Sequence, residues 1–337
     1  MPPSPRRRPT RPPRRPRWAE PALSSATPVA SVDRLESADV DDVLALLREA
    51  TDADGVRPVS EETELRLQHG GHAGARDLLA RTADGALAGY ARFEPGDGDE
   101  EAAGEVVVSP IARRGGIGGA LVGRLEDLAD GRPLRIWAHG DLPAATALAG
   151  RRGYTRARVL LQMRRPLAGV PADPEPVLPE GVSVQPFVPG RDEDAWLRVN
   201  ARAFATHPEQ GGWTAEDLRL REAAPWFDPA GFLLAWRGDP DAGGSLLGSH
   251  WTKEHPPGDA GDEPVGEVYV LGVDPAAQGL GLGRVLTDLG LAHLRRRGLR
   301  EVLLYVEEEN TTAVRLYEGR GFTRSAVDVS WRRDPAS

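Results

Sequence analysis

The chain has 337 residues, 40% of them hydrophobic, which is room for about two domains with proper apolar cores. Its formal net charge of −9 argues against a general nucleic-acid-binding protein. There is no cysteine, so disulfides and thiolate chemistry are excluded. No apolar run reaches the roughly 18 residues of a membrane span, and no apolar leader follows the N-terminus. We therefore expect a cytoplasmic protein that does not enter a membrane.

Lysine is almost absent. Lys253 is the only lysine among 42 basic residues, the rest being arginine. A position that keeps lysine against this bias favours a role for a compact, mobile point charge, which arginine does not reproduce.

The first part of the chain divides into a tail and one folded unit. Residues 1–29 are rich in arginine and proline without any apolar period, and we expect a disordered tail. Residues 30–167 form the first unit. Its pattern predicts helices over 37–47, 62–68 and 142–149, with a further helix after 118. Strands are expected over 77–81, 86–93, 105–108, 134–138 and 159–164, the last of which closes the unit.

A second unit repeats this order. Residues 168–181 carry four prolines and read as a linker. The second unit, 182–334, begins with a strand over 183–187 and a helix over 192–204. Further strands are expected over 232–236, 246–251, 267–273, 302–306 and 326–331. Helices are expected from 282 to about 298 and over 311–320.

A glycine-rich loop follows the strand over 267–273. It reads Gln278-Gly-Leu-Gly-Leu-Gly283 and leads into a helix. Glycines let backbone approach a ligand, and free amides at a helix start favour an anion. A dinucleotide-binding turn would lie tight against the strand, and a Walker loop would end in Gly-Lys-Ser/Thr. Neither fits, because four residues intervene and Gly283 precedes Arg284.

The loop occurs twice. Arg113-Arg-Gly-Gly-Ile-Gly118 has the same Arg/Gln-x-x-Gly-x-Gly spelling, 165 residues before the loop that starts at Gln278. The Gly153-Tyr154 and Gly321-Phe322 turns are 168 residues apart. Two independent anchors with nearly equal offsets indicate an internal repeat.

This loop after a Val-x-Pro strand end resembles the coenzyme A pyrophosphate loop of the GNAT N-acetyltransferases. The resemblance covers about residues 30–333. It implies an α/β (α+β) fold with two tandem GNAT domains, each a mixed, largely antiparallel twisted sheet flanked by helices. It also implies acetyl-CoA as co-substrate and no metal. The implied cofactor contacts in the second half are Leu271, Gly272, Val273, Gln278, Gly279, Leu280, Gly281, Leu282, Gly283, Arg284, Asn310, Thr311, Thr312, Ala313, Val314 and Arg315. Those in the first half are Val106, Val107, Val108, Arg114, Gly115, Gly116, Ile117, Gly118 and Gly119.

Acetyl transfer to an amine needs a base for the amine proton and an acid for the leaving thiolate. We expect Glu267, at the start of the strand before the loop, to be the base. Tyr317 matches a tyrosine that serves as general acid in many GNAT enzymes. The repeat places Ala102 opposite Glu267 and Ala149 opposite Tyr317. We therefore expect the first half to keep an anion cradle without the catalytic pair.

Further motifs resemble a branch of the GNAT family whose members carry two such domains and act in mycothiol synthesis. They are WAHG (137–140), LQMRRPL (161–167), HPEQGGW (207–213), WFDP (226–229), HWTK (250–253) and GEVYVLGVDP (266–275). The resemblance implies acetylation of the cysteinyl amine of desacetylmycothiol (Cys-GlcN-Ins). Carried over residue by residue, the substrate contacts are Glu61, Glu209, Lys253, Glu267 and Tyr305. The insert from Glu254 to Pro264 departs from the pattern and leaves the place of Lys253 open.

Two alternatives stay open. The first is a GNAT enzyme for another amine, such as a protein N-terminus or an antibiotic. The second is a non-catalytic acetyl-CoA sensor, which the presence of Glu267 and Tyr317 in one half only speaks against. We expect a monomer that binds a small-molecule amine, without nucleic-acid or membrane partners.

Overall fold

The computed structural model describes residues 28–69, 74–96, 101–171, 176–205, 207–258, 260–261 and 263–335. The side chains of residues 68, 69, 208 and 209 lie outside the described part. None of the described helices combines the length and apolar character needed to cross a bilayer.

The first half follows the predicted order of elements. Its strands are β1 (Val29–Val32), β2 (Arg76–Arg81), β3 (Leu87–Glu94), β4 (Ala102–Val108), β5 (Leu134–Ala138) and β6 (Thr155–Pro166), and its helices are α1 (Ser37–Asp54), α2 (Glu61–His69), α3 (Ile117–Ala129) and α4 (Pro143–Arg151). Val29, the last residue of the predicted tail, pairs with Ala80 in β2, whereas residues 1–27 of that tail lie outside the described part of the chain. β1 has only four residues, too short for an alternation signal.

The second half repeats the pattern, with five described helices against four in the first half. Its strands are β7 (Val182–Pro186), β8 (Phe232–Arg237), β9 (Ser245–His255), β10 (Val265–Val273), β11 (Glu301–Glu307) and β12 (Thr323–Arg333), and its helices are α5 (Glu193–Ala203), α6 (Pro208–Gly211), α7 (Ala215–Glu222), α8 (Leu282–Arg296) and α9 (Thr311–Glu318). β9 extends to His255, so Lys253 and Glu254 belong to this strand. The insert therefore begins after His255, and the doubt about the place of Lys253 is removed.

One sheet of 12 strands runs through both lobes, in the order β1-β2-β3-β4-β5-β12-β6-β11-β10-β9-β8-β7. Its two parallel pairs are β4 with β5 and β10 with β11. The other neighbouring pairs are antiparallel. The expected mixed, largely antiparallel sheet is confirmed.

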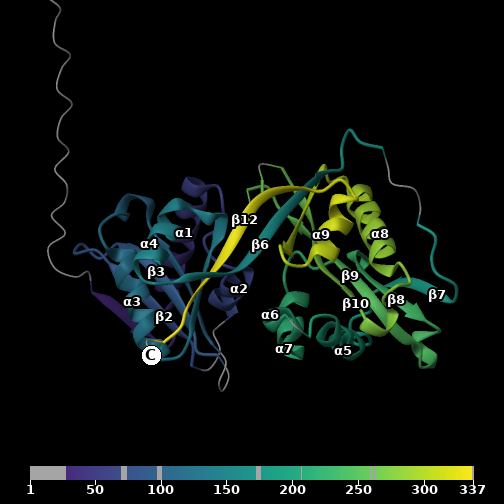
Figure 1. Ribbon diagram of the computed structural model, residues 1–337, viewed down its shortest axis with the longest axis horizontal. Coiled ribbons are helices and arrows are strands. Elements are labelled where there is room, and N and C mark those ends of the chain that lie inside the picture. Colours follow the sequence, from purple (N-terminus) through teal and green to yellow (C-terminus); the bar gives the residue numbers. More distant parts are fainter. Residues whose placement is uncertain are drawn as a thin grey trace, which may run out of the picture.

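The two halves exchange their last strands. β12, from the end of the chain, pairs with β5 of the first half, whereas β6 pairs with β11 of the second half. β6 and β12 also pair with each other and cross between the lobes (Figure 1). The prediction that the strand over 159–164 closes the first unit was therefore wrong. Local sequence specifies that a strand forms, but not which of two equivalent edges it joins.

Helices cover both faces of the sheet in each half. In the first half α3 packs on one face through Leu121 and Leu125, and α1 on the other through Val43 and Leu47. In the second half α8 and α9 cover one face, and α5 and α7 cover the other around the buried Trp196 and Trp251.

A bulge in β10 reverses the alternation of its side chains. The pairing of β10 with β9 shifts between Val268 and Val270. Consequently Val268 joins the core under α8 and α9, while Val270, two residues later, joins the core under α5 and α7. Side chains along a strand alternate between the two faces of the sheet, so one additional residue moves every later side chain to the opposite face. Glu267, before the bulge, thus lies on the same face as Val270.

Candidate active site

Glu267 lies at the centre of the second half, on β10 between β9 and β11. It pairs with Lys253 of β9 on one side and with Leu303 of β11 on the other. Its side chain is 6% exposed. His255 Nε2 lies 2.6 Å from Glu267 Oε2. The carboxylate is therefore held in a buried position by a neighbouring strand.

The ionisation of Glu267 is governed by opposing effects. Burial alone raises the pKa of this carboxyl, but the hydrogen bond and charge of His255, then Lys253 and Arg57, outweigh it. The net pKa is below the ordinary value of 4.5. Glu267 is thus an anion at neutral pH despite its burial, which a proton acceptor requires.

Lys253 connects this site to the first half of the chain. Its ammonium donates to Glu61 Oε1, at the start of α2. The same nitrogen lies 4.7 Å from the Trp226 ring centroid and 5.4 Å from that of Tyr269. A cation against two aromatic faces and a carboxylate is fixed in position. The expected residues Glu61, Lys253 and Glu267 are therefore brought together, from both halves.

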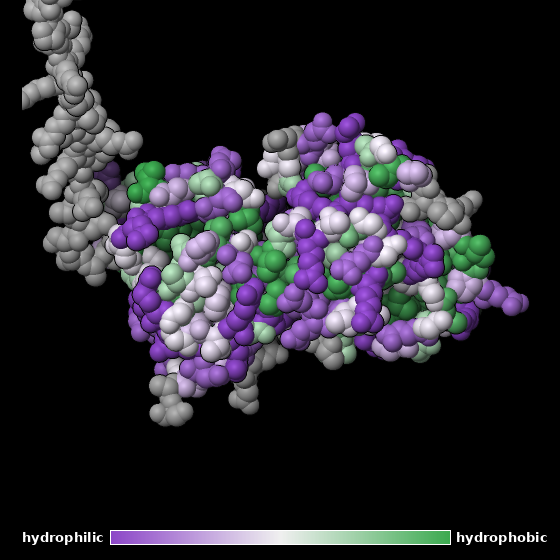
Figure 2. All heavy atoms as spheres, turned by 45° about the horizontal axis from the view of Figure 1, so that its top comes forward, coloured by the Kyte–Doolittle hydropathy of each residue, from purple (hydrophilic) through white to green (hydrophobic). Residues whose placement is uncertain are grey.

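α2 is held against the second half by further ion pairs. Arg221 of α7 donates to Glu62 at 2.7 Å and to the Tyr269 hydroxyl at 2.8 Å. Arg66 donates to Asp217 at 2.6 Å. Because Arg66 and Arg221 are buried, these bonds are sheltered from water and fix the helix that carries Glu61. The surface is hollowed where the two lobes meet (Figure 2).

Tyr305 is the exposed member of the group. It lies on β11, 42% exposed, and its hydroxyl accepts from Gln162 at 2.9 Å. Partial desolvation of the phenol and the negative charge of Glu267 raise the pKa of Tyr305 to about 12. It is thus a neutral hydrogen-bonding group at neutral pH, near Glu267 and open to a ligand.

Tyr317 belongs to α9, and its side chain lies in the core between this helix and the sheet. It is 6% exposed, and its ring packs against Phe322 with 5.7 Å between centroids. Burial raises the pKa of its hydroxyl well above 10.0. The phenol is therefore protonated at neutral pH, but burial also makes it a weaker acid. Its role as general acid remains a proposal.

The glycine loop forms the expected helix-start geometry. Gly279 and Gly281 have φ values of +83° and +76°, which glycine adopts without strain. Gly281 is the N-cap of α8 and offers no side chain to the first amides. These amides are therefore available to an anion. Asn310 caps α9 by accepting from the Ala313 amide at 3.1 Å.

β10 and β11 separate beside this loop. Their pairing ends at Val268 and Leu304, so Leu271, Gly272 and Val273 have no partner in β11. Leu271 and Val273 pack towards α8 with Leu282 and Leu286. Separated parallel strands next to a helix start are the opening that an extended thioester arm would need.

The first half has the same cradle, with alanine at the places of Glu267 and Tyr317. Gly116, with φ +88°, is the N-cap of α3 and, like Gly281, adds no side-chain cap. Arg114 adopts φ 67° at the place of Gly279. The sheet registers place Ala103, rather than Ala102, opposite Glu267, because the bulge in β10 adds one residue. Either residue is alanine, so the first half has no carboxylate at the place of Glu267.

Sequence reasoning missed His255 and Arg57. His255 stands two residues after Lys253, so the strand period of 2 places both on one face, a signal that was available. Arg57 acts from the loop before α2, and no local pattern connects it with Glu267. The expected substrate residue Glu209 belongs to α6, but its side chain lies outside the described residues.

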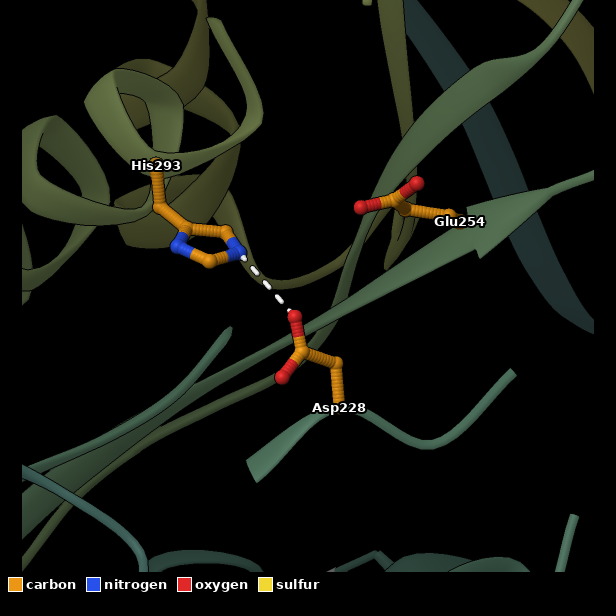
Figure 3. A group of neighbouring side chains, drawn as sticks. All are labelled: Asp228, Glu254 and His293. Carbon is orange, nitrogen blue, oxygen red and sulfur yellow. Dashed lines mark ion pairs between the residues drawn. The ribbon is translucent and has the colours of Figure 1, made fainter. Parts of the chain in front are cut away.

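A separate group of ligand-type side chains lies beside the end of β9. Figure 3 shows Asp228, Glu254 and His293 directed towards one another, with the His293 Nε2 3.9 Å from Asp228 Oδ2. Glu254 also accepts from Arg297 at 2.6 Å. Because this arginine already supplies the counter-charge, we assign no metal to the group.

Known proteins resemble this chain in both sequence and fold. The profile of the Acetyltransferase (GNAT) family matches residues 41–154 and 196–322, once in each half. Two solved structures share the tandem fold. A GCN5-related N-acetyltransferase from Sphaerobacter thermophilus has a TM-score of 0.67 and 26% identity over 90% of this chain and 95% of that one. A tandem GNAT protein from the clavulanic acid biosynthesis pathway has a TM-score of 0.68 and 21% identity, covering 92% of this chain and all of that one (100%). The chain is an N-acetyltransferase of the GNAT family.

Within that family its relatives are more specific. The chain is 71% identical over 311 residues to a mycothiol acetyltransferase from Geodermatophilus obscurus, covering 92% of this chain and 99% of that protein. It is 57% identical to a mycothiol acetyltransferase from Thermobispora bispora, covering 88% and 96%. The chain belongs to the mycothiol acetyltransferase family.

Proposed function

We propose that the chain transfers the acetyl group of acetyl-CoA to the cysteinyl amine of desacetylmycothiol, giving mycothiol. The observation that carries this proposal is the ion-paired group of Glu267, Lys253 and Glu61 on and beside β10, the strand that leads to the glycine loop and the uncapped start of α8. The identity to mycothiol acetyltransferases supports the choice of substrate.

The loop before α8 fits the pyrophosphate of acetyl-CoA. A Cβ at Gly279 or Gly281 would meet nothing within 4 Å, so space is open there and the positive φ is the reason for glycine. Backbone amides of Gly281 to Arg284 would donate hydrogen bonds to the phosphate oxygens, assisted by the helix dipole. Acetyl-CoA supplies the activated thioester when bound.

Glu267 would take one proton from the substrate ammonium, leaving the amine lone pair free to attack the thioester carbonyl. A carbon–nitrogen bond then forms and the carbon–sulfur bond breaks. Tyr317 would give its proton to the departing thiolate. The newly acylated nitrogen would lose its second proton, which returns through solvent to the Tyr317 phenolate. Unpaired amides of β10 would stabilise the negative charge on the carbonyl oxygen.

Glu61 and Lys253 would bind the sugar and inositol hydroxyls of the substrate. Carboxylates accept hydrogen bonds from hydroxyls, and a lysine ammonium has three protons to donate. Tyr305, exposed and neutral, would add a further contact. Since Glu61 comes from α2, the first half would serve as a wall of the substrate site, although it has alanine at the places of Glu267 and Tyr317.

A substrate panel tests the proposal. Purified enzyme receives acetyl-CoA with desacetylmycothiol, with the same pseudodisaccharide lacking cysteine, or with a peptide amine, and mass spectrometry detects addition of an acetyl group. We expect acetylation of the cysteinyl compound at its amine only. Turnover of the peptide with none of the cysteinyl compound would contradict the proposal.

Because we also propose a monomer, light scattering of the same sample should give the mass of one chain.

A further inference from the structure

His255 comes from β9, the neighbour of the strand that carries Glu267. It pairs with Val265, and Lys253 pairs with Glu267. Since side chains alternate, His255, Lys253 and Glu267 lie on the same face, with His255 diagonal to Glu267. The register of a long hairpin, rather than a loop, therefore sets this contact.

The contact is a short hydrogen bond away from water. Nε2 and Oε2 are 2.6 Å apart, and the two residues are 7% and 6% exposed. A nitrogen and an oxygen at this distance need a proton between them, so the imidazole donates. Oε2 is thereby committed to His255, and Oε1 remains to accept a second proton.

Burial makes a charged carboxylate costly without such a partner. The other groups that act on Glu267 are Lys253 from the same strand as His255, Arg57 before α2 and Tyr305 from β11. Lys253 is already paired with Glu61, and Arg57 contacts Glu64 at 3.4 Å. His255 is thus the partner that hydrogen-bonds the carboxylate directly.

We propose that His255 is a positioning residue for acetyl transfer: it keeps the buried Glu267 ionised and fixes which of its oxygens accepts the amine proton. This inference rests on the proposed role of Glu267 as the base. In the step itself the ammonium loses one proton to Oε1, and the bond between Nε2 and Oε2 stays intact throughout.

Two variants separate this role from packing alone. His255→Leu removes the donor, and His255→Gln keeps a neutral N–H donor of similar reach. The rate of acetyl transfer is measured from about pH 4 to 9, so that the range includes the ordinary glutamate pKa, with the amine that the wild-type enzyme accepts. The KM for acetyl-CoA and the midpoint of thermal unfolding serve as controls.

The sign of the shift follows from the loss of the partner. Without His255, burial dominates and the carboxyl holds its proton to higher pH, so the acid limb of kcat moves up by about one pH unit in His255→Leu. At about pH 4 we expect kcat of His255→Leu to fall several-fold below the wild-type value, with little difference at about pH 7 because the carboxyl is ionised in both proteins there. The KM for acetyl-CoA should stay within about twofold. His255→Gln should lie between the wild type and His255→Leu. An acid limb at the wild-type pH in His255→Leu, with or without a uniform loss of rate, would overturn the proposal.

Difference infrared spectroscopy gives a readout that needs no turnover. The band of the protonated Glu267 carboxyl, assigned by its loss in E267Q, should appear at higher pH in His255→Leu than in wild type. The same titration in both proteins would overturn the inference even if the substrate panel succeeds. A shifted titration would support it even if the panel identifies another amine.

Discussion

Glu61 and Lys253, 192 residues apart in the chain, form an ion pair inside the candidate site with side-chain exposures of 22% and 6%. The pair joins α2 of the first half to β9 of the second half, and β9 is the neighbour of the strand that carries Glu267. In the proposed function, this pair is how the first half forms one wall of the substrate site.

Glu61→Gln should therefore weaken binding of the amine substrate without affecting the cofactor. Loss of a charged hydrogen bond costs about 1.5–3 kcal/mol, so we expect the KM for desacetylmycothiol to rise roughly 10- to 100-fold. The KM for acetyl-CoA should stay unchanged. Glu308→Gln, which removes an exposed ion pair with Arg324, is the control and should behave as wild type. Equal increases in both KM values would contradict the assignment of Glu61.

The two cradles offer a matched pair of substitutions. Gly281→Val and Gly116→Val each place a β-branched residue at a positive φ and a Cβ before the free amides of a helix. We expect Gly281→Val to weaken acetyl-CoA binding and reduce kcat/KM at least roughly 100-fold, because the amides form the binding site. Gly116→Val should keep most of the activity. Steady-state kinetics and thermal unfolding of both variants make the comparison, and loss of activity in a folded Gly116→Val would show that the first cradle takes part in the reaction.

A partly buried histidine, His139, should make stability depend on pH. His139 Nδ1 lies 3.1 Å from Asp328 Oδ2, and Nε2 lies 3.5 Å from Glu105 Oε1. Burial lowers the pKa of His139, but the two carboxylates outweigh it and raise the pKa from 6.5 to about 10. A folded-state pKa above the unfolded value gives stability that is complete below about pH 6.5 and is lost as pH rises through about 10.

The free energy of unfolding should thus fall between about pH 7 and 10, by roughly 2–4 kcal/mol from this group. His139→Gln removes the titration, and its unfolding free energy should vary less over the same range. Urea unfolding at a series of pH values measures both curves. Parallel curves for the two proteins would show that His139 does not carry a proton in the folded state.

The sequence predicted most elements because their signals are local. The glycine loop, the helix with Leu282 and Leu286, and the paired Gly-aromatic turns are defined by nearby residues, and the repeat followed from their spacing. The substrate residues Glu61 and Lys253 came from a family resemblance, since no local pattern brings α2 to β9.

Features that depend on tertiary pairing were missed. Whether β6 joins β5 or β11 depends on competition between two similar sheet edges, which the residues of β6 do not reveal. The bulge at Tyr269 was also missed, because Glu267 to Val273 is apolar on both faces and an additional residue leaves no gap in such a run. The bulge matters, since it is the reason that Ala103 is the counterpart of Glu267.

The central claim is that proton transfer occurs only in the second half, at Glu267. The most direct measurement is the pH dependence of kcat for Glu267→Gln, with acetyl-CoA binding measured by calorimetry on the same sample. We predict a fall in kcat of at least roughly 100-fold, loss of the acid limb and unchanged acetyl-CoA affinity. A variant that binds acetyl-CoA and retains both the rate and the pH profile of the wild type would contradict the account.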